Sequence, residues 1–183
     1  MASRSPITAA AFVTSDEGDF LSRSRPVSFS EFARTPVHWL ALGFGAGLAP
    51  RAPGTFGTLV AWPLHLLLLL LPWGVHGAVV ILACVAGIWI CGESARKLGV
   101  HDHSAIVWDE IAAFALLLWA LPVQSPAWWL AAFLLFRLFD IWKPWPIRDL
   151  DHRLHGGTGI MLDDIAAALF AWVLLLASTL ILN

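Results

Sequence analysis

Long apolar runs separated by prolines and short polar loops constrain this chain more than any other feature. Five such runs cover residues 57–71, 77–95, 105–121, 127–142 and 159–182. Of the 183 residues, 58% are hydrophobic and 13% are charged, against a charged share of about 25% in soluble domains. The runs predict an all-α fold: a compact, membrane-embedded bundle of about five main helices.

The N-terminal region differs from the rest of the chain. Residues 1–35 are rich in Ser, Arg and Pro, a composition that predicts a mostly disordered cytoplasmic tail. Residues 37–49 are apolar but are broken by three glycines, which favours an interfacial or re-entrant segment over a full span. We therefore expect a tail followed by a single helical membrane domain over residues 36–183.

The charges are distributed unevenly along the predicted bundle. If each of the five runs crosses the membrane once, all 11 Lys and Arg residues fall on one face or in the helix ends beside it. The positive-inside rule places that face in the cytoplasm. All 13 Asp and Glu residues share the face, which the rule does not require, so a polar site is expected there. The net charge of −2 argues against a nucleic-acid partner.

Carboxylates lie about one turn inside three of the predicted helices. They are Asp109 and Glu110, Asp140, and Asp163 and Asp164, each flanked by apolar residues. Burying such anions is costly without a compensating cation, and oxygen ligands favour Mg²⁺. The alternatives are that Asp109 and Asp163 are first-turn helix anions and that Asp140 is a solvated interfacial residue.

Basic residues close to these carboxylates are candidates for holding a phosphate. Lys143, Arg148 and Arg153 occupy the loop before the last run, and Arg grips phosphate through paired hydrogen bonds whereas Lys acts as a point charge. The alternative is that they only obey the positive-inside rule. Arg137 precedes Asp140 by one helical turn, where it can pair with a carboxylate.

Two further segments are candidates for the same site. Gly54, Thr55 and Thr58 lie in a Pro- and Gly-rich entry to the first long run, where backbone N–H groups can bind an anion; a simple capping turn is the alternative. His155 is a candidate to act on a leaving group. The run His101-Asp102-His103 is either a source of a metal ligand or acid, or a solvated loop.

Other hydrolase patterns are absent from the sequence. Cys84 and Cys91 lie within one apolar run, and the position six residues after Cys91 is Lys97 rather than the Arg of a cysteine phosphatase loop. The chain also has no Gly-x-Ser-x-Gly nucleophile elbow. Both thiols are therefore interpreted as apolar packing residues.

Three long blocks carry a family resemblance. LGFGAGLAPRAPGTFGTL, GVHDHSAIVWDEIAAF and FRLFDIWKPWPIRDLDHRLHGGTGIMLDDIAAA resemble the phosphatidylglycerophosphatase A family, over about residues 37–180. The resemblance implies an all-helical, Mg²⁺-dependent phosphatase of the bacterial inner membrane that converts phosphatidylglycerophosphate to phosphatidylglycerol. It carries the family's motif over to the loop 53–58 and to Asp109, Glu110, Asp140, Lys143, Arg148, Asp163 and Asp164.

These observations combine into one hypothesis and two rivals. Glu110, Asp140 and Asp164 bind Mg²⁺; Asp109, Asp163 and His155 act in catalysis; and Lys143, Arg148, Gly54, Thr55 and Thr58 hold the phosphate. Attack by water and an aspartyl-phosphate intermediate are both open. The rivals are a transferase acting on a CDP-lipid, whose Asp-Gly-x-x-Ala-Arg run is absent, and a divalent-cation transporter, whose acids would lie near the bilayer midplane.

Overall fold

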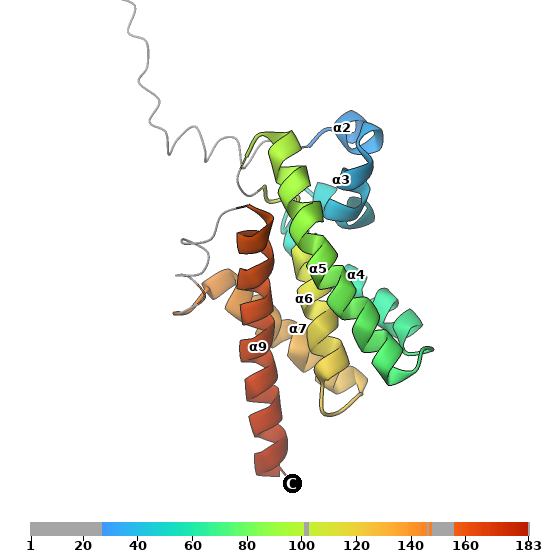
Figure 1. Ribbon diagram of the computed structural model, residues 1–183. Coiled ribbons are helices and arrows are strands. Elements are labelled where there is room, and N and C mark those ends of the chain that lie inside the picture. Colours follow the sequence, from blue (N-terminus) through green and yellow to red (C-terminus); the bar gives the residue numbers. More distant parts are fainter. Residues whose placement is uncertain (1–26, 101–102, 146, 148–155, 183) are drawn as a thin grey trace, which may run out of the picture.

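The computed structural model describes residues 27–100, 103–145, 147 and 156–182, and within these residues the regular secondary structure is entirely helical (Figure 1). The elements in chain order are α2 (Phe29–Arg34), α3 (Pro36–Ala41), the 3₁₀ helix η1 (Gly43–Leu48), α4 (Pro53–Leu68), α5 (Trp73–Leu98), α6 (Trp108–Ala120), α7 (Pro126–Trp142) and α9 (Gly157–Leu182). The predicted all-α fold class is confirmed.

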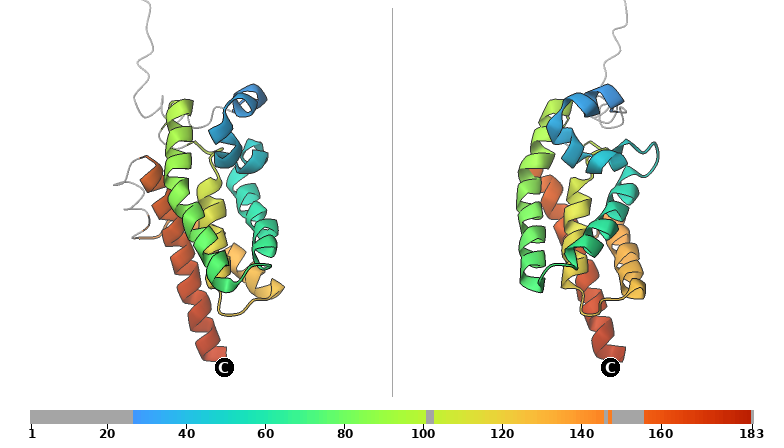
Figure 2. Two further views of the ribbon diagram at one scale, coloured as in Figure 1. Left: turned by 45° about the vertical axis from the view of Figure 1, so that its right-hand side comes forward. Right: turned by 90° about the vertical axis from the view of Figure 1, so that its right-hand side faces the viewer.

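Helix α6 forms the centre of the bundle. It packs against α4, α5 and α9 and also contacts α7 (Figure 2), and most of its side chains, from Ile111 to Leu118, are buried. Alanines of α6 and α9 lie in the same core cluster. Small side chains let helix backbones approach closely, so these alanines allow α9 to lie along α6 over several turns.

Local sequence sets the starts of α7 and α9. Ser125 caps α7 by accepting a hydrogen bond from the Trp128 N–H, and Pro126 occupies the first turn, where a missing N–H costs nothing. Helix α9 begins after Gly156, at φ +72°. A β-carbon on the next residue, Gly157, would lie 1.8 Å from the Ile88 carbonyl oxygen of α5. Glycine at this position thus brings the start of α9 against α5.

The structure corrects several sequence predictions about the elements. The bundle has more helices than the five predicted, because the apolar segment 37–49 folds into α3 and η1, and α2 forms inside the predicted tail 1–35. Phe32 of α2 is buried and packs with Val37 and Ala41 of α3. The prediction missed α2 because the burial of Phe32 depends on a cluster that includes Ile90 of α5, a neighbour far along the chain. Residues 1–26 lie outside the described residues.

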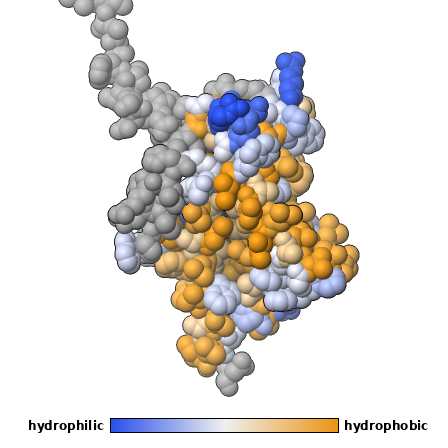
Figure 3. Space-filling view, viewed as in Figure 1, coloured by the Kyte–Doolittle hydropathy of each residue, from blue (hydrophilic) through white to orange (hydrophobic). Residues whose placement is uncertain are grey.

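Two of the described helices, α5 and α9, are long and apolar enough to cross a membrane. Helices α6, with 13 residues, and α4, with 16, are shorter, about 20 and 24 Å at 1.5 Å per residue. On the face seen in Figure 3, strongly hydrophilic residues gather at the end where α5 finishes and hydrophobic residues dominate the remainder. The exposed large apolar side chains of α5 and α9 suit a lipid environment.

Candidate active site

A pocket of about 250 Å³ brings together the carboxylates from all three helices that the sequence analysis singled out. They are Asp109 and Glu110 of α6, Asp140 of α7, and Asp163 and Asp164 of α9. Two cations, Arg137 and Lys143, line the same pocket. The described lining therefore holds five acidic side chains and two Lys or Arg side chains. The pocket thus has an excess of negative charge among mostly buried side chains.

Helix geometry explains part of this arrangement. Asp109 and Glu110 lie in the first turn of α6, where the positive end of the helix dipole stabilises an anion. The alternative interpretation of Asp109 as a helix-capping anion therefore stands beside the functional one. For Asp163 that alternative is wrong, because α9 starts at Gly157 and has no acid in its first turn.

Arg137 is the centre of an ion-pair network. Its Nη1 lies 2.8 Å from Oε1 of Glu110 and 2.6 Å from Oδ2 of Asp140, and it donates to Oγ1 of Thr58 at 3.4 Å. The three charged side chains are between 11% and 14% exposed. The predicted pairing of Arg137 with a carboxylate is confirmed, and the alternative of a solvated Asp140 is not supported.

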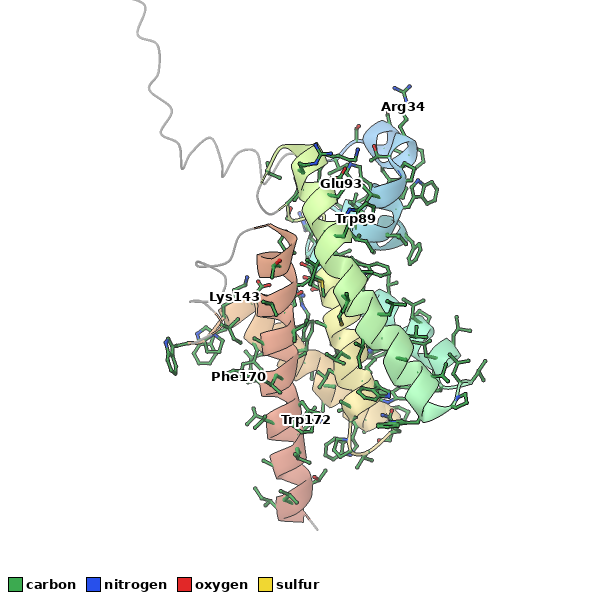
Figure 4. All side chains as sticks on the ribbon, viewed as in Figure 1. Arg34, Trp89, Glu93, Lys143, Phe170 and Trp172 are labelled. Carbon is green, nitrogen blue, oxygen red and sulfur yellow. The ribbon has the colours of Figure 1, made fainter. Side chains whose placement is uncertain are left out.

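Lys143 makes the second cationic contact in the pocket. Its Nζ lies 2.5 Å from Oδ2 of Asp163, and Figure 4 shows its side chain beside the first turns of α9. Lys143 follows α7 with φ +44° and ψ +63°, a left-handed conformation that non-glycine residues rarely adopt. Ala52, which also lines the pocket, has φ +49°. Strain of this kind gathers at functional sites.

The first turn of α4 closes the pocket against Glu110. A β-carbon on Gly54 would lie 1.8 Å from Oε1 of Glu110, and one on Gly57 would lie 2.6 Å from Cβ of Val107. Thr58 is fully buried and donates its hydroxyl hydrogen to the Gly54 carbonyl oxygen at 2.8 Å. The two glycines therefore allow a carboxylate of α6 to reach the N-terminal turn of α4.

Comparison with known proteins decides the family. The phosphatidylglycerophosphatase A family matches residues 39–179, which cover the pocket described above. The chain belongs to this family. Its members are phosphatases, so the chain is a hydrolase of that class.

Curated relatives agree with this placement. The phosphatidylglycerophosphatase A of Escherichia coli is 45% identical over 82% of this chain and 88% of its own length. That of Haemophilus influenzae is 46% identical over 78% and 88%. A Bacteroides thetaiotaomicron protein, provisionally named a phosphatidylinositol-3-phosphatase, is 37% identical over 74% and 89%. No solved structure shows a significant match to the chain.

The residues predicted for the site fall into three groups according to where the structure places them. Those lining the pocket are Gly54, Asp109, Glu110, Asp140, Lys143, Asp163 and Asp164. Thr55 and Thr58 do not line it. Arg148 and His155 lie outside the described residues, as do Arg153, His101 and Asp102. The roles predicted for all of them stay predictions.

Some lining residues were not singled out for the site. Ser104 and Ala52 line the pocket, and no feature of their immediate sequence indicates it. His103, for which a ligand role and a solvated loop were both open, also lines the pocket and is 3% exposed. Its Nδ1 accepts a hydrogen bond from the Ala105 N–H. The bridging role of Arg137 across two helices was likewise not predicted.

The donor chemistry of the pocket suits a hard divalent cation. Its acids offer only oxygen ligands, and Oδ2 of Asp164 is buried with no hydrogen-bond partner among the described residues, an arrangement that is costly unless a cation is bound. Within the same residues, no three His, Cys, Asp or Glu side chains already form a group that could hold a metal ion. Glu110 and Asp140 are instead paired with Arg137.

Proposed function

We propose that this protein hydrolyses phosphatidylglycerophosphate to phosphatidylglycerol and phosphate, with Mg²⁺, as a step of phospholipid biosynthesis. The observation that carries the proposal is the pocket in which five carboxylates from three helices meet Lys143 and Arg137. The names of the Escherichia coli and Haemophilus influenzae relatives support the choice of head group.

We further propose that the protein is a multi-pass protein of the bacterial inner membrane and that the pocket faces the cytoplasm. The supporting observations are the two long apolar helices α5 and α9 and the confinement of Lys and Arg to one predicted face. A pocket at that face lets a phosphate group enter from water while the acyl chains of the lipid stay in the bilayer.

Charge balance supports the requirement for a divalent cation. A phosphomonoester brings about two negative charges near neutral pH into a pocket whose described lining already has more acids than bases. Glu110, Asp140 and Asp164 are the residues we propose to hold Mg²⁺. When bound, the ion would offset this repulsion and polarise the phosphoryl oxygens.

The protein's own side chains have separate tasks in this proposal. Lys143, held by its backbone conformation beside Asp163, supplies positive charge to the phosphate. Asp109, 8% exposed in the pocket, accepts a proton from the attacking water. A bond forms between the water oxygen and phosphorus, and the bond from phosphorus to the glycerol oxygen breaks. That glycerol oxygen takes up a proton, for which His155 is the predicted donor.

The testing experiment uses the purified full-length chain in detergent micelles. Phosphate release is measured from phosphatidylglycerophosphate, from phosphatidylinositol 3-phosphate, which the Bacteroides thetaiotaomicron relative suggests, and from soluble glycerol 3-phosphate. We expect release from the first lipid at least about tenfold faster than from the others, and its loss after chelation of Mg²⁺. Equal rates with the inositol lipid would overturn the head-group assignment, and full activity in chelator would overturn the role of the metal.

The same preparation tests the rival functions. A transferase acting on a CDP-lipid would release CMP, and a cation transporter would carry Mn²⁺ or Mg²⁺ across proteoliposomes. We expect neither. The acids of the pocket contact Arg137 and Lys143 near the ends of α7 and α9, whereas a transport path should continue through the bilayer midplane.

A further inference from the structure

The inference concerns Arg137, a cation that contacts carboxylates from two different helices of the pocket. Its guanidinium reaches Glu110 of α6 and Asp140 of its own helix, at 2.8 and 2.6 Å. It also touches Thr58, which is anchored to Gly54 of α4. A single side chain thus connects three helices at the pocket.

A structural purpose alone does not explain this contact pattern. Burying one Arg requires one compensating anion, because a single close carboxylate already neutralises it. Arg137 has two, and its Nε is buried without a hydrogen-bond partner among the described residues. The guanidinium therefore lies between two carboxylates that would otherwise repel each other. Its Nε–H group remains without an acceptor among the described residues.

The two carboxylates that Arg137 contacts belong to the set proposed above for the divalent cation. While Glu110 and Asp140 face the guanidinium, no described group of three acidic, histidine or cysteine side chains is arranged to hold an ion. A fixed positive charge within about 3 Å of both carboxylates also opposes the approach of a second cation by direct Coulomb repulsion.

We infer that Arg137 is a positioning residue that holds Glu110 and Asp140 together and weakens the pocket's affinity for a divalent cation. The inference rests on the proposed function, because it concerns the same carboxylates. It predicts that removal of the arginine charge strengthens cation binding, which is the reverse of what loss of a merely structural contact would do.

The experiment measures Mn²⁺ binding to the full-length protein in detergent, without substrate, by the electron paramagnetic resonance signal of free Mn²⁺. Mn²⁺ shares the oxygen-ligand preference of Mg²⁺. The variant Arg137→Met should bind Mn²⁺ at least about fivefold more tightly than the wild-type protein, because one repelling charge is gone. Arg137→Lys keeps a charge that reaches only one carboxylate, and its affinity should lie between the two.

The control is Arg96→Met. Arg96 is 70% exposed and pairs with Glu93 on α5, outside the pocket, so its replacement should leave the Mn²⁺ affinity unchanged. Should Arg137→Met fail to fold, Arg137→Lys decides the question through thermal unfolding: Mn²⁺ should raise its midpoint by more than that of the wild-type protein.

Two results would count against the inference in different ways. Mn²⁺ binding by the wild-type protein with unchanged or weaker binding by the folded Arg137 variants would overturn the inference alone. Absence of Mn²⁺ binding by the wild-type protein, together with metal-independent phosphate release, would overturn the metal requirement of the proposed function and the inference with it.

Discussion

Oε1 of Glu110 lies 1.8 Å from the position that a β-carbon on Gly54 would occupy. The first turn of α6 therefore meets the first turn of α4 at a residue without a side chain. Arg137 pairs with that carboxylate, and the space where a side chain of residue 54 would stand is taken by its oxygens. The orientation of Glu110 therefore depends on Gly54, a residue more than fifty positions earlier in the chain. This matters for the site because Glu110 is a proposed metal ligand.

Gly54→Ala should displace Glu110 and reduce phosphate release by at least about tenfold, because overpacking a close contact forces side chains out of their preferred rotamers. The measurement is initial rate per folded molecule with phosphatidylglycerophosphate in micelles. Gly74→Ala is the matched control: its β-carbon would have no neighbour within 4 Å, so its rate should equal that of the wild-type protein. An active Gly54→Ala variant would mean that the close approach is not needed.

Asp164→Asn should abolish Mg²⁺-dependent phosphate release, with a fall of at least about a hundredfold. Asp164 is 3% exposed and its Oδ2 has no hydrogen-bond partner in the described residues, so an amide of the same shape keeps the packing and loses the charge. Membrane insertion and helix content, followed by fractionation and circular dichroism, should be unchanged. Near-normal turnover would remove Asp164 from the proposed ligand set.

Two substitutions of Lys143 distinguish the effect of backbone strain from the effect of losing the charge. Lys143→Gly and Lys143→Ala both remove the ion pair with Asp163 and should both lower turnover by at least about tenfold. Glycine tolerates φ +44°, so Lys143→Gly should be more stable than Lys143→Ala by about 1 kcal/mol. Thermal unfolding in detergent measures the difference, and equal stabilities would contradict the left-handed conformation of this residue.

Gln124 forms hydrogen bonds with several helices at the end of the bundle opposite the pocket. Its Oε1 accepts from Nε1 of Trp129 at 3.0 Å and lies 3.3 Å from Nε2 of His65, and its Nε2 donates to the Leu118 carbonyl oxygen at 2.7 Å. Gln124→Ala should destabilise the protein by about 1 kcal/mol, since it removes partly buried hydrogen bonds, one of them beside the buried His65 ring.

The readout for Gln124→Ala is again thermal unfolding, now combined with phosphate release per folded molecule. Release should stay at the wild-type value, because Gln124 does not line the acidic pocket. A large loss of turnover at unchanged stability would show that this end of the bundle takes part in the reaction.

Several features of this protein follow from local sequence. A helix needs only an apolar stretch of suitable period and proper ends, so the runs near 127–142 and 159–182 matched α7 and α9 within two residues. The sequence also indicated that the acids lie near helix ends, because position within a helix depends only on neighbouring residues. The family resemblance followed from the three quoted blocks and is confirmed by the family match.

Other features required the tertiary structure. Whether acids of separate helices face one another depends on how α6, α7 and α9 pack, and that packing is set by contacts between distant residues such as Gly157 with Ile88. The same holds for Arg137, whose second partner, Glu110, lies 27 positions away, and for α2, which is fixed by burial of Phe32 against α3. The sequence by itself determined which residues are acidic, which are apolar and where the five long helices form. Only the fold decided which charges meet, since side-chain distances depend on the relative placement of whole helices.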